Sequence, residues 1–277
     1  MAGHGTPEAG AAVIVRRSQS EIAKLRRANQ LVAAVLARLR AMVAPGVTTH
    51  DLDVAAEAMV REAGAVPAFK GYHGYPATVC ASVNEQVVHG IPSKKPLVPG
   101  DIVSIDMGAV LDGYFGDCAV TVPVGPIAPD VVELLRVTEE ALFRGIDAVK
   151  PGARVSDIGA AVQRHVESAG FSVVREFVGH GIGTSLHEEP QIANYGPGGK
   201  GPRLAEGMAL AIEPMVNAGR PEVQVLSDGW TAVSRDRSLS AHFEHTVVVS
   251  SDGCEILTLL EHDAERAKSM MGAAVRH

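Results

Sequence analysis

Apolar residues recur every three or four positions through residues 22–43, and this spacing is typical of a helix with one buried face. Ser18 and Glu21 precede the pattern with the spacing of a capping box, which satisfies the first unpaired amide groups of a helix. Pro45-Gly46 follows it, and proline ends a helix because its ring interrupts the hydrogen-bond ladder. The first predicted element is therefore a long amphipathic helix.

A second, shorter helix is predicted directly afterwards. Thr48 and Asp51 form another capping pair, and the helical pattern runs through Glu62. Gly64 then stands where a left-handed cap is needed, a conformation that glycine adopts without steric penalty.

This two-helix pattern returns in the second half of the chain at an offset of 106 residues. The strand pattern repeats too, since residues 99–106 resemble residues 206–213 at an offset of 107. We interpret the repeats as a duplicated unit of two helices and a sheet, with a period too long for a solenoid. Asp106 then corresponds to Glu213, and two pseudo-symmetric halves would bring both acids to a central site. The repeated helix signals are Pro45-Gly46 and Pro151-Gly152, Asp51 and Asp157, and Ala63-Gly64 and Ala169-Gly170.

Two carboxylates lie in mostly apolar runs that are predicted as strands. Asp106 ends the run 102–105, Asp117 opens the run 118–122, and Asp112-Gly113 between them is a hairpin turn signal. An ionised carboxylate among apolar residues is unfavourable unless it meets a cation. Either aspartate alone is typical of a turn or a cap, but two on opposed strands indicate part of a metal site.

Three further residues could complete such a site. His180 lies among the glycines of residues 179–183, Glu213 follows the apolar run 208–212, and Glu244 borders another apolar run. Each alone would also suit a loop or a strand end. Together, four carboxylates and one imidazole suit one or two divalent ions such as Mn, Fe(II), Co or Zn. Two such ions can share a bridging water, lower its pKa and polarise a carbonyl group.

Composition limits the alternatives. The 277 residues could form one large domain or two moderate ones, and 46% hydrophobic with 21% charged residues is ordinary for a globular protein. The net charge of −7 argues against a nucleic-acid or anionic-membrane partner. Three cysteines without paired spacing predict neither a disulfide framework nor a cysteine zinc site, which fits a reducing cytoplasm. No apolar run approaches the length of a membrane span.

Several short motifs surround the candidate ligands. They are Tyr72-His73-Gly74-Tyr75-Pro76, Asn84-Glu85-Gln86-Val87-Val88-His89-Gly90-Ile91-Pro92, Ser104-Ile105-Asp106-Met107-Gly108, Gly113-Tyr114-Phe115-Gly116-Asp117, Gly179-His180-Gly181-Ile182-Gly183, His187-Glu188-Glu189-Pro190, Ile212-Glu213-Pro214, Asp228-Gly229-Trp230-Thr231, Asp236-Arg237-Ser238-Leu239-Ser240-Ala241 and Glu244-His245-Thr246. From about residue 18 to about residue 260, this set resembles the type I methionine aminopeptidases, in the bacterial form with a short N-terminus. The resemblance implies the pita-bread fold, an α+β fold with two pseudo-symmetric α/β halves around a central metal site. This expectation agrees with the internal repeat.

The resemblance also implies two divalent metal ions per chain, which could be Co, Mn, Fe(II) or Zn. Asp106 would chelate one ion, and His180 with Glu213 would hold the other. Asp117 and Glu244 would bridge the two ions. A water or hydroxide between the ions would attack the first peptide bond, with Glu213 as the proton shuttle.

Other residues would bind the substrate. By the same resemblance, His89 would contact the scissile amide or the leaving nitrogen, and His187 would stabilise the oxyanion. The chain departs from many bacterial members at Leu186 (Phe), Phe69 (Cys), Val88 (Cys) and His242 (Gln), and these departures concern pocket shape and tolerance at the penultimate residue. The implied methionine pocket consists of Phe69, Tyr72, Tyr75, Cys80, His89, Leu186, His187 and Trp230.

The implied function is removal of the initiator methionine from nascent proteins with a small penultimate residue. We expect a cytoplasmic monomer that acts on N-terminal Met peptides near the ribosome and binds neither nucleic acid nor membrane. Residues 18–262 would form one catalytic domain, with halves at about 18–125 and 126–262. Residues 1–17 would be a flexible N-terminal segment, and 263–277 a polar tail.

Two alternatives remain at this point. A proline-directed relative, of the aminopeptidase P or prolidase type, shares the five ligands but usually has a long additional N-terminal domain. A non-catalytic scaffold of the same fold would bind RNA, ribosomes or proteins, although such relatives lose the ligands that this chain keeps.

Overall fold

The predicted N-terminal helix pair is present in the computed structural model, which describes residues 13–271. Helix α1 spans Gln19–Met42 and α2 spans Thr49–Glu62. Both begin at the predicted capping boxes, at Ser18 and at Thr48. These caps satisfy amide groups that a helix leaves unpaired at its start, and they fix where each helix begins.

The internal repeat is confirmed at the level of individual elements. Helix α3 spans Pro129–Asp147, and α4 spans Val155–Ser168, so α4 begins and ends 106 residues after α2. The Asp157 carboxylate accepts the backbone N–H of Arg154 at 2.7 Å, as the Asp51 carboxylate accepts that of Thr48 at 2.9 Å. The duplicated sequence signals therefore produce duplicated local structure.

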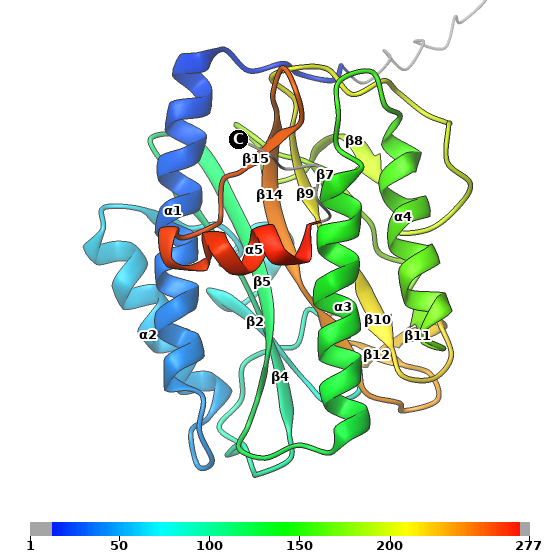
Figure 1. Cartoon of the computed structure of the whole chain (residues 1–277). Coiled ribbons are helices and arrows are strands. Elements are labelled where there is room, and N and C mark those ends of the chain that lie inside the picture. Colours follow the sequence, from blue (N-terminus) through cyan, green and yellow to red (C-terminus); the bar gives the residue numbers. More distant parts are fainter. Residues whose placement is uncertain (1–12, 272–277) are drawn as a thin grey trace, which may run out of the picture.

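Nine strands form the main sheet, and the helices cover one face of it (Figure 1). The strand order is β1-β4-β5-β14-β9-β7-β8, with β2 paired to β4 and β15 paired to β14. One apolar core lies between α1, α2 and the strands of the first half, and another lies between α3, α4 and the strands of the second half. In Figure 1, α1 and α3 lie in front of the sheet, with α2 and α4 at the flanks. These strands span Val66–Pro67 (β1), Val79–Val83 (β2), Ile102–Leu111 (β4), Tyr114–Pro123 (β5), Gly179–Gly181 (β7), Glu188–Ile192 (β8), Ala209–Ile212 (β9), Glu244–Val249 (β14) and Cys254–Ile256 (β15).

The hairpin predicted around Asp112-Gly113 connects β4 and β5. Both turn residues have left-handed backbone angles, with φ of 52° and 79°, as a two-residue turn of the type I′ class requires. In the resulting register Asp106 is opposite Ala119, and Asp117 is opposite Gly108. Residues opposite one another point to the same face of a sheet, and so do residues two apart on one strand. Asp106 and Gly108 are two apart and Gly108 is opposite Asp117, so both aspartates point to one face. The helix α1 packs against the other face, where Gly116 is too close to the Ala28 backbone to carry a side chain.

Two three-stranded sheets complete the fold near the open face of the main sheet. One has the order β13-β10-β6 and the other β11-β12-β3. Their strands are short, and Val88, Met215 and His242 on them line the cavity described in the next subsection. The bounds are Ser172–Val173 (β6), Met215–Asn217 (β10), Ser240–His242 (β13), Gln86–Val88 (β3), Val223–Val225 (β11) and Ala232–Ser234 (β12), with a 3₁₀ turn η1 at Tyr72–Gly74.

The C-terminal part of the described chain differs from the predicted polar tail. A 3₁₀ turn η2 at Glu261–Asp263 leads into a helix α5 at Ala264–Met270, which lies across the space between α1 and α3 (Figure 1). Ala267 and Met271 are buried against the core of the second half. The sequence did not indicate this helix, because one buried alanine within it and one buried methionine directly after it give too weak a periodic signal. The rest of the predicted tail, from residue 272, lies outside the described residues.

Most of the predicted N-terminal segment, residues 1–12, also lies outside the described residues. Within residues 13–17 there is no helix or strand, but the Arg17 side chain is buried. No helix within residues 13–271 is long and apolar enough to cross a membrane.

Candidate metal centre

The five candidate metal ligands come from five strands that are consecutive neighbours in the main sheet. Read across the sheet, Asp106 lies on β4, Asp117 on β5, Glu244 on β14, Glu213 directly after β9 and His180 on β7. Neighbouring strands are about 4.8 Å apart, so side chains from consecutive strands can meet on one face. Residues that are up to 138 positions apart in the sequence (106 to 244) thus converge at the centre of the sheet.

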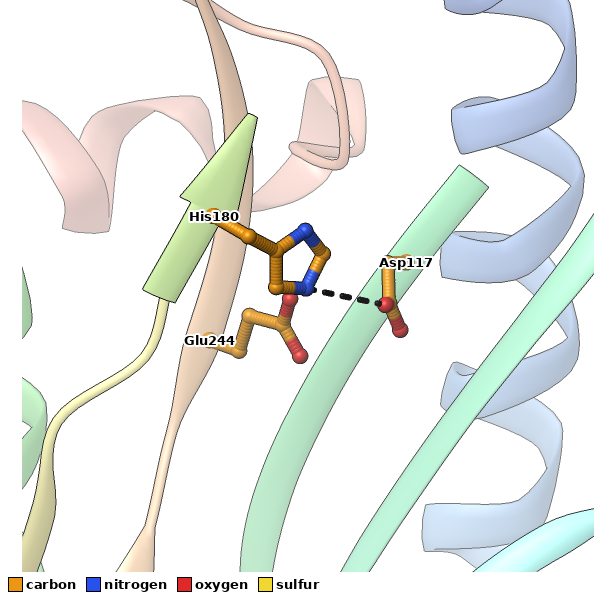
Figure 2. A group of neighbouring side chains, drawn as sticks. All are labelled: Asp117, His180 and Glu244. Carbon is orange, nitrogen blue, oxygen red and sulfur yellow. Dashed lines mark ion pairs between the residues drawn. The ribbon is translucent and has the colours of Figure 1, made fainter. Parts of the chain in front are cut away.

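Figure 2 shows Asp117, His180 and Glu244 pointing toward one another from their three strands. Each offers one donor atom within 4.8 Å of the other two, a spacing that a single metal ion can bridge. His180 Nε2 lies 3.9 Å from Asp117 Oδ2 and 3.4 Å from Glu213 Oε1. These separations are mostly too long for hydrogen bonds but suit donors that share a cation.

Several carboxylate oxygens in this group are buried without any hydrogen-bond partner. They are Asp106 Oδ1, Asp117 Oδ1 and Glu244 Oε1. Such orphaned oxygens are rare in folded proteins because leaving a charged acceptor unpaired is unfavourable. A divalent ion would satisfy them, so the donor set fits a metal.

Burial also shifts the ionisation of the four carboxyl groups. Desolvation raises the pKa of Asp106 to about 7. It raises the pKa of Asp117 well above its usual range, and the nearby Asp106 and Glu213 add to the effect. Desolvation followed by neighbouring carboxylates likewise raises the pKa values of Glu213 and Glu244. Mutual repulsion of this kind is what a bound cation removes.

His180 is prepared to act as a neutral ligand. Burial, together with the nearby His187, lowers its pKa to about 4, so the ring is uncharged at neutral pH. Its Nδ1 lies 2.9 Å from the Gly181 carbonyl oxygen and can donate to it. That hydrogen bond leaves the Nε2 lone pair directed at the carboxylates, as in many histidine ligands of metals.

A cavity of about 210 Å³ opens beside these donors. Aromatic and apolar side chains form most of its wall, with Tyr75 packed edge-on to Trp230 at 5.1 Å between ring centroids. All five candidate ligands and all eight residues of the predicted methionine pocket line this one cavity. The eight are Phe69, Tyr72, Tyr75, Cys80, His89, Leu186, His187 and Trp230.

The two histidines expected to contact substrate both line this cavity. The His187 ring is 4.3 Å from the His180 ring, and its Nδ1 is 2.7 Å from the Tyr72 hydroxyl. His89 has a left-handed backbone with φ of 60° and packs edge-on against Phe177. A positive φ is unfavourable for a residue with a side chain, and such strain is common at functional sites.

Sequence reasoning did not select five residues that also line the cavity. His242, noted only as a departure from the resembled family, has a buried Nε2 without a hydrogen-bond partner, 3.9 Å from Glu213 Oε2. Phe177 could have been found as an aromatic residue three positions before His180. Val88, like His242, was noted only as a departure from the resembled family, and Val178 and Met215 carry no such signal.

A larger cavity, of about 540 Å³, lies on the helical side of the sheet beneath α5. It contains none of the candidate ligands, although Cys118 and His245 on its floor are sequence neighbours of two of them. We therefore place the functional site at the smaller cavity, because it contains all five candidate ligands and the larger one contains none.

Comparison with known proteins agrees with this geometry. Residues 23–251 match metallopeptidase family M24. Methionine aminopeptidase 1 of Bacillus subtilis is 51% identical over 246 residues, which cover 89% of this chain and 99% of that protein. This chain is a methionine aminopeptidase family member, within metallopeptidase family M24. The crystal structure of methionine aminopeptidase from Rickettsia prowazekii superimposes with a TM-score of 0.88 at 44% identity, covering 89% of this chain and all (100%) of that one.

Membership of this family confirms the predicted pita-bread fold and the α+β class. It also weighs against the proline-directed alternative. The prolidase from Pyrococcus furiosus has a TM-score of 0.74 but only 23% identity, and this chain covers 66% of its length. That likeness shows a common fold and no more. As a member of metallopeptidase family M24, the chain is a metal-dependent hydrolase, and the orphaned carboxylates form a candidate site for the metal.

Truncating Trp230 to alanine should weaken discrimination at the first substrate residue. We expect the ratio of kcat/KM for Met-Ala-Ser over Leu-Ala-Ser to fall by roughly 10-fold, because one wall of a fitted apolar pocket is worth about 1–3 kcal/mol. The backbone turn should survive, since the Trp230 amide, not the ring, is bound to Asp228. Trp230→Phe is the matched control and should keep most of the ratio. An unchanged ratio in the alanine variant would remove Trp230 from the pocket.

Proposed function

We propose that this enzyme removes the N-terminal methionine from nascent proteins whose penultimate residue is small. The observation that supports this most strongly is one cavity of about 210 Å³ whose lining combines five candidate metal donors with an aromatic slot. An aromatic and apolar wall suits a flexible thioether side chain. The methionine aminopeptidases of Bacillus subtilis and Rickettsia prowazekii each match 89% of this chain and nearly all of their own length.

The proposed ligand roles are those that the family resemblance implies, and all five donors line one cavity. Asp106 would hold one divalent ion, His180 and Glu213 a second, and Asp117 with Glu244 would lie between them. Bound divalent ions would lower the pKa of a water and polarise the substrate carbonyl. Two ions are proposed because four carboxylates balance the charge of two divalent cations, and Mn, Fe(II), Co and Zn all tolerate this oxygen-rich set.

The remaining residues would bind and orient the peptide. Glu213 is itself one of the candidate donors, and its pKa is raised by burial and then by Asp106, so it could accept and return a proton. Burial lowers the pKa of His89 to about 4, so its neutral ring could accept or donate a hydrogen bond at the scissile amide. His187, held by Tyr72, would donate to the developing oxyanion.

The charge and composition of the chain bear on where the enzyme acts. With a net charge of −7, no disulfide framework predicted from the three cysteines, and no spanning helix in residues 13–271, we propose a cytoplasmic monomer that meets nascent chains near the ribosome. Residues 18–262 would act as a single catalytic domain.

The test is release of free methionine from Met-Ala-Ser by metal-free protein titrated with Mn²⁺, Fe²⁺ or Co²⁺. Activity should be absent without metal and should rise with added ion. Ala-Pro-Ser is the control that a proline-directed enzyme would cleave at its first bond. Cleavage of Ala-Pro-Ser with no methionine release would overturn the proposal, and no cleavage of either peptide with any ion would favour a non-catalytic role.

A further inference from the structure

The segment before α1 is fixed to the loop that carries two residues of the candidate substrate site. This loop, which we define as residues 183–188, leads from β7 to Glu188 at the start of β8 and includes Leu186 and His187. Arg17 lies 171 positions from Glu188 in sequence, yet its Nη2 donates to Glu188 Oε1 at 2.5 Å and also contacts Oε2. Both side chains are well buried, with 6% and 13% exposed.

The Glu188 carboxylate in turn organises the loop backbone. Its Oε1 accepts the N–H groups of Thr184 at 2.9 Å and Ser185 at 3.1 Å. These are the two residues directly before Leu186. One carboxylate thus joins the Arg17 guanidinium to the start of the segment that aims Leu186 and His187 into the cavity. Charge-assisted hydrogen bonds of this kind are stronger than neutral ones.

Arg17 is itself held from two sides. Its backbone N–H donates to the Gly207 carbonyl oxygen at 2.7 Å, and its Nη1 lies 3.5 Å from Glu21 Oε1 in the first turn of α1. The guanidinium packs directly against Gly183, where a Cβ would lie only 2.1 Å from Arg17 Nη2. A side chain at residue 183 would therefore have to displace the guanidinium from its present position.

From these contacts we propose that Arg17 is a positioning residue for the substrate site, acting through Glu188 to hold the loop 183–188. The proposal rests on the proposed function, because it assigns the loop's purpose as orienting Leu186 and His187 against an N-terminal Met peptide. A misplacement of about 1 Å at such residues can lower catalysis by roughly 100-fold. A second ion pair, Arg26 with Glu255, joins α1 to β15 and is 43% and 44% exposed, so it serves as a surface control.

Three single variants test the proposal. Arg17→Met removes the charge, Arg17→Lys keeps a cation that can reach Glu188, and Gly183→Ala displaces the guanidinium while leaving both charges in the chain. We expect Arg17→Met and Gly183→Ala to lower kcat/KM for Met-Ala-Ser by about 10- to 100-fold and to reduce the Met-over-Leu ratio. Arg17→Lys should retain most of both, and Arg26→Met should match the wild type.

The double variant Arg17→Met with Gly183→Ala adds a test of mechanism. Once the guanidinium is gone, the alanine Cβ has space, so the second change should add little to the first. The Met-over-Leu ratio does not depend on the fraction of folded enzyme, and it separates positioning from a loss of stability. If both single variants keep the wild-type ratio, or if Arg26→Met changes it equally, the proposal is wrong.

Hydrogen exchange separates this proposal from the proposed function. Amides of residues 183–188 should exchange faster in Arg17→Met and Gly183→Ala than in the wild type and in Arg26→Met. If the variants exchange faster but the wild-type protein releases no methionine, Arg17 still holds the loop, and only the proposed function is wrong. If exchange at these amides is unchanged in the variants, Arg17 does not hold the loop, and the proposal is wrong regardless of the measured activity.

Discussion

Asp106→Asn is expected to lower kcat/KM for methionine release by on the order of 1,000-fold, since loss of a metal's polarising effect removes several kcal/mol of transition-state stabilisation. Asparagine preserves the shape of Asp106 but carries no charge. Asp106 Oδ1 is buried without a partner, so its negative charge has no evident role other than to meet a cation. Metal content measured on the purified variant should fall together with activity.

The same change should not destabilise the metal-free protein. The pKa of Asp106 is raised to about 7 by burial, which means that its ionised form is unfavourable in the fold. Asp106 also contributes, after desolvation, to the raised pKa values of Asp117, Glu213 and Glu244. Removing this charge relieves repulsion, and we expect the Tm of the metal-free variant at pH 8 to equal or exceed that of the wild type.

Asp112→Asn is the matched control for this prediction. Asp112 has φ of 52° in the exposed hairpin turn and pairs with Arg27 at the surface. Asparagine tolerates the left-handed backbone equally well, so activity and Tm should stay close to the wild-type values. Near-normal turnover by Asp106→Asn, or an equal loss in the control, would contradict the assignment of Asp106 as a ligand.

Removal of the metal should destabilise the protein, and more so at higher pH. Saturation at 100 times the Kd of an ion contributes about 2.7 kcal/mol, which for a chain of this size corresponds to roughly 5 to 10 °C in Tm. The site presents four buried carboxyl groups whose pKa values are raised chiefly by desolvation. Without a cation their charges repel one another, and with it they are paired.

The sign of the pH dependence follows from the raised pKa values. The metal-free fold binds protons more tightly than the unfolded chain, so its carboxyl groups favour folding most at low pH, below the unfolded pKa of Asp106 at 3.8. That stability is lost as the pH rises through the folded pKa of about 7. Bound metal must displace these protons, so the gain in Tm on adding Mn²⁺ should grow between about pH 5 and pH 8.

Thermal unfolding of metal-free protein with and without Mn²⁺, at pH 5.5 and pH 8, measures this effect. Asp106→Asn provides the comparison, since it should show a smaller gain on adding Mn²⁺ at pH 8. A gain that is the same at both pH values would mean that the carboxyl groups are already ionised and paired in the metal-free fold. A gain that is larger at pH 5.5 would reverse the predicted sign.

Local chemistry made much of the fold predictable. The capping pairs at Ser18 and Thr48, the Asp112-Gly113 turn and the glycine at position 64 each satisfy a requirement of their own backbone segment. Such signals act within a few residues, so they can be recognised in the chain directly. The duplication extended them to the second half. The short helix α5 was not recognised because its burial depends on a groove between α1 and α3 that belongs to the tertiary structure.

The candidate ligands could be named from the sequence because carboxylates in apolar strands are unusual and because their motifs resemble a known family. The repeat predicted that Asp106 and Glu213 would meet, but no local sequence pattern shows the convergence of all five ligands. It depends on the order β4-β5-β14-β9-β7, which no local pattern encodes. The same is true of Phe177 and of the unpartnered His242, which reach the cavity from separate segments.

The sequence by itself therefore determined the capped helices, the central hairpin, the duplicated halves, the family and the types of donor, since these follow from periodicity, spacing and motif. Only the tertiary structure decided that the donors share one space with the aromatic slot, and that Arg17 reaches Glu188 across 171 residues. The physical reason is that burial, unpaired oxygens and close approach are properties of atoms brought together by packing. A residue's neighbours in the chain do not fix them.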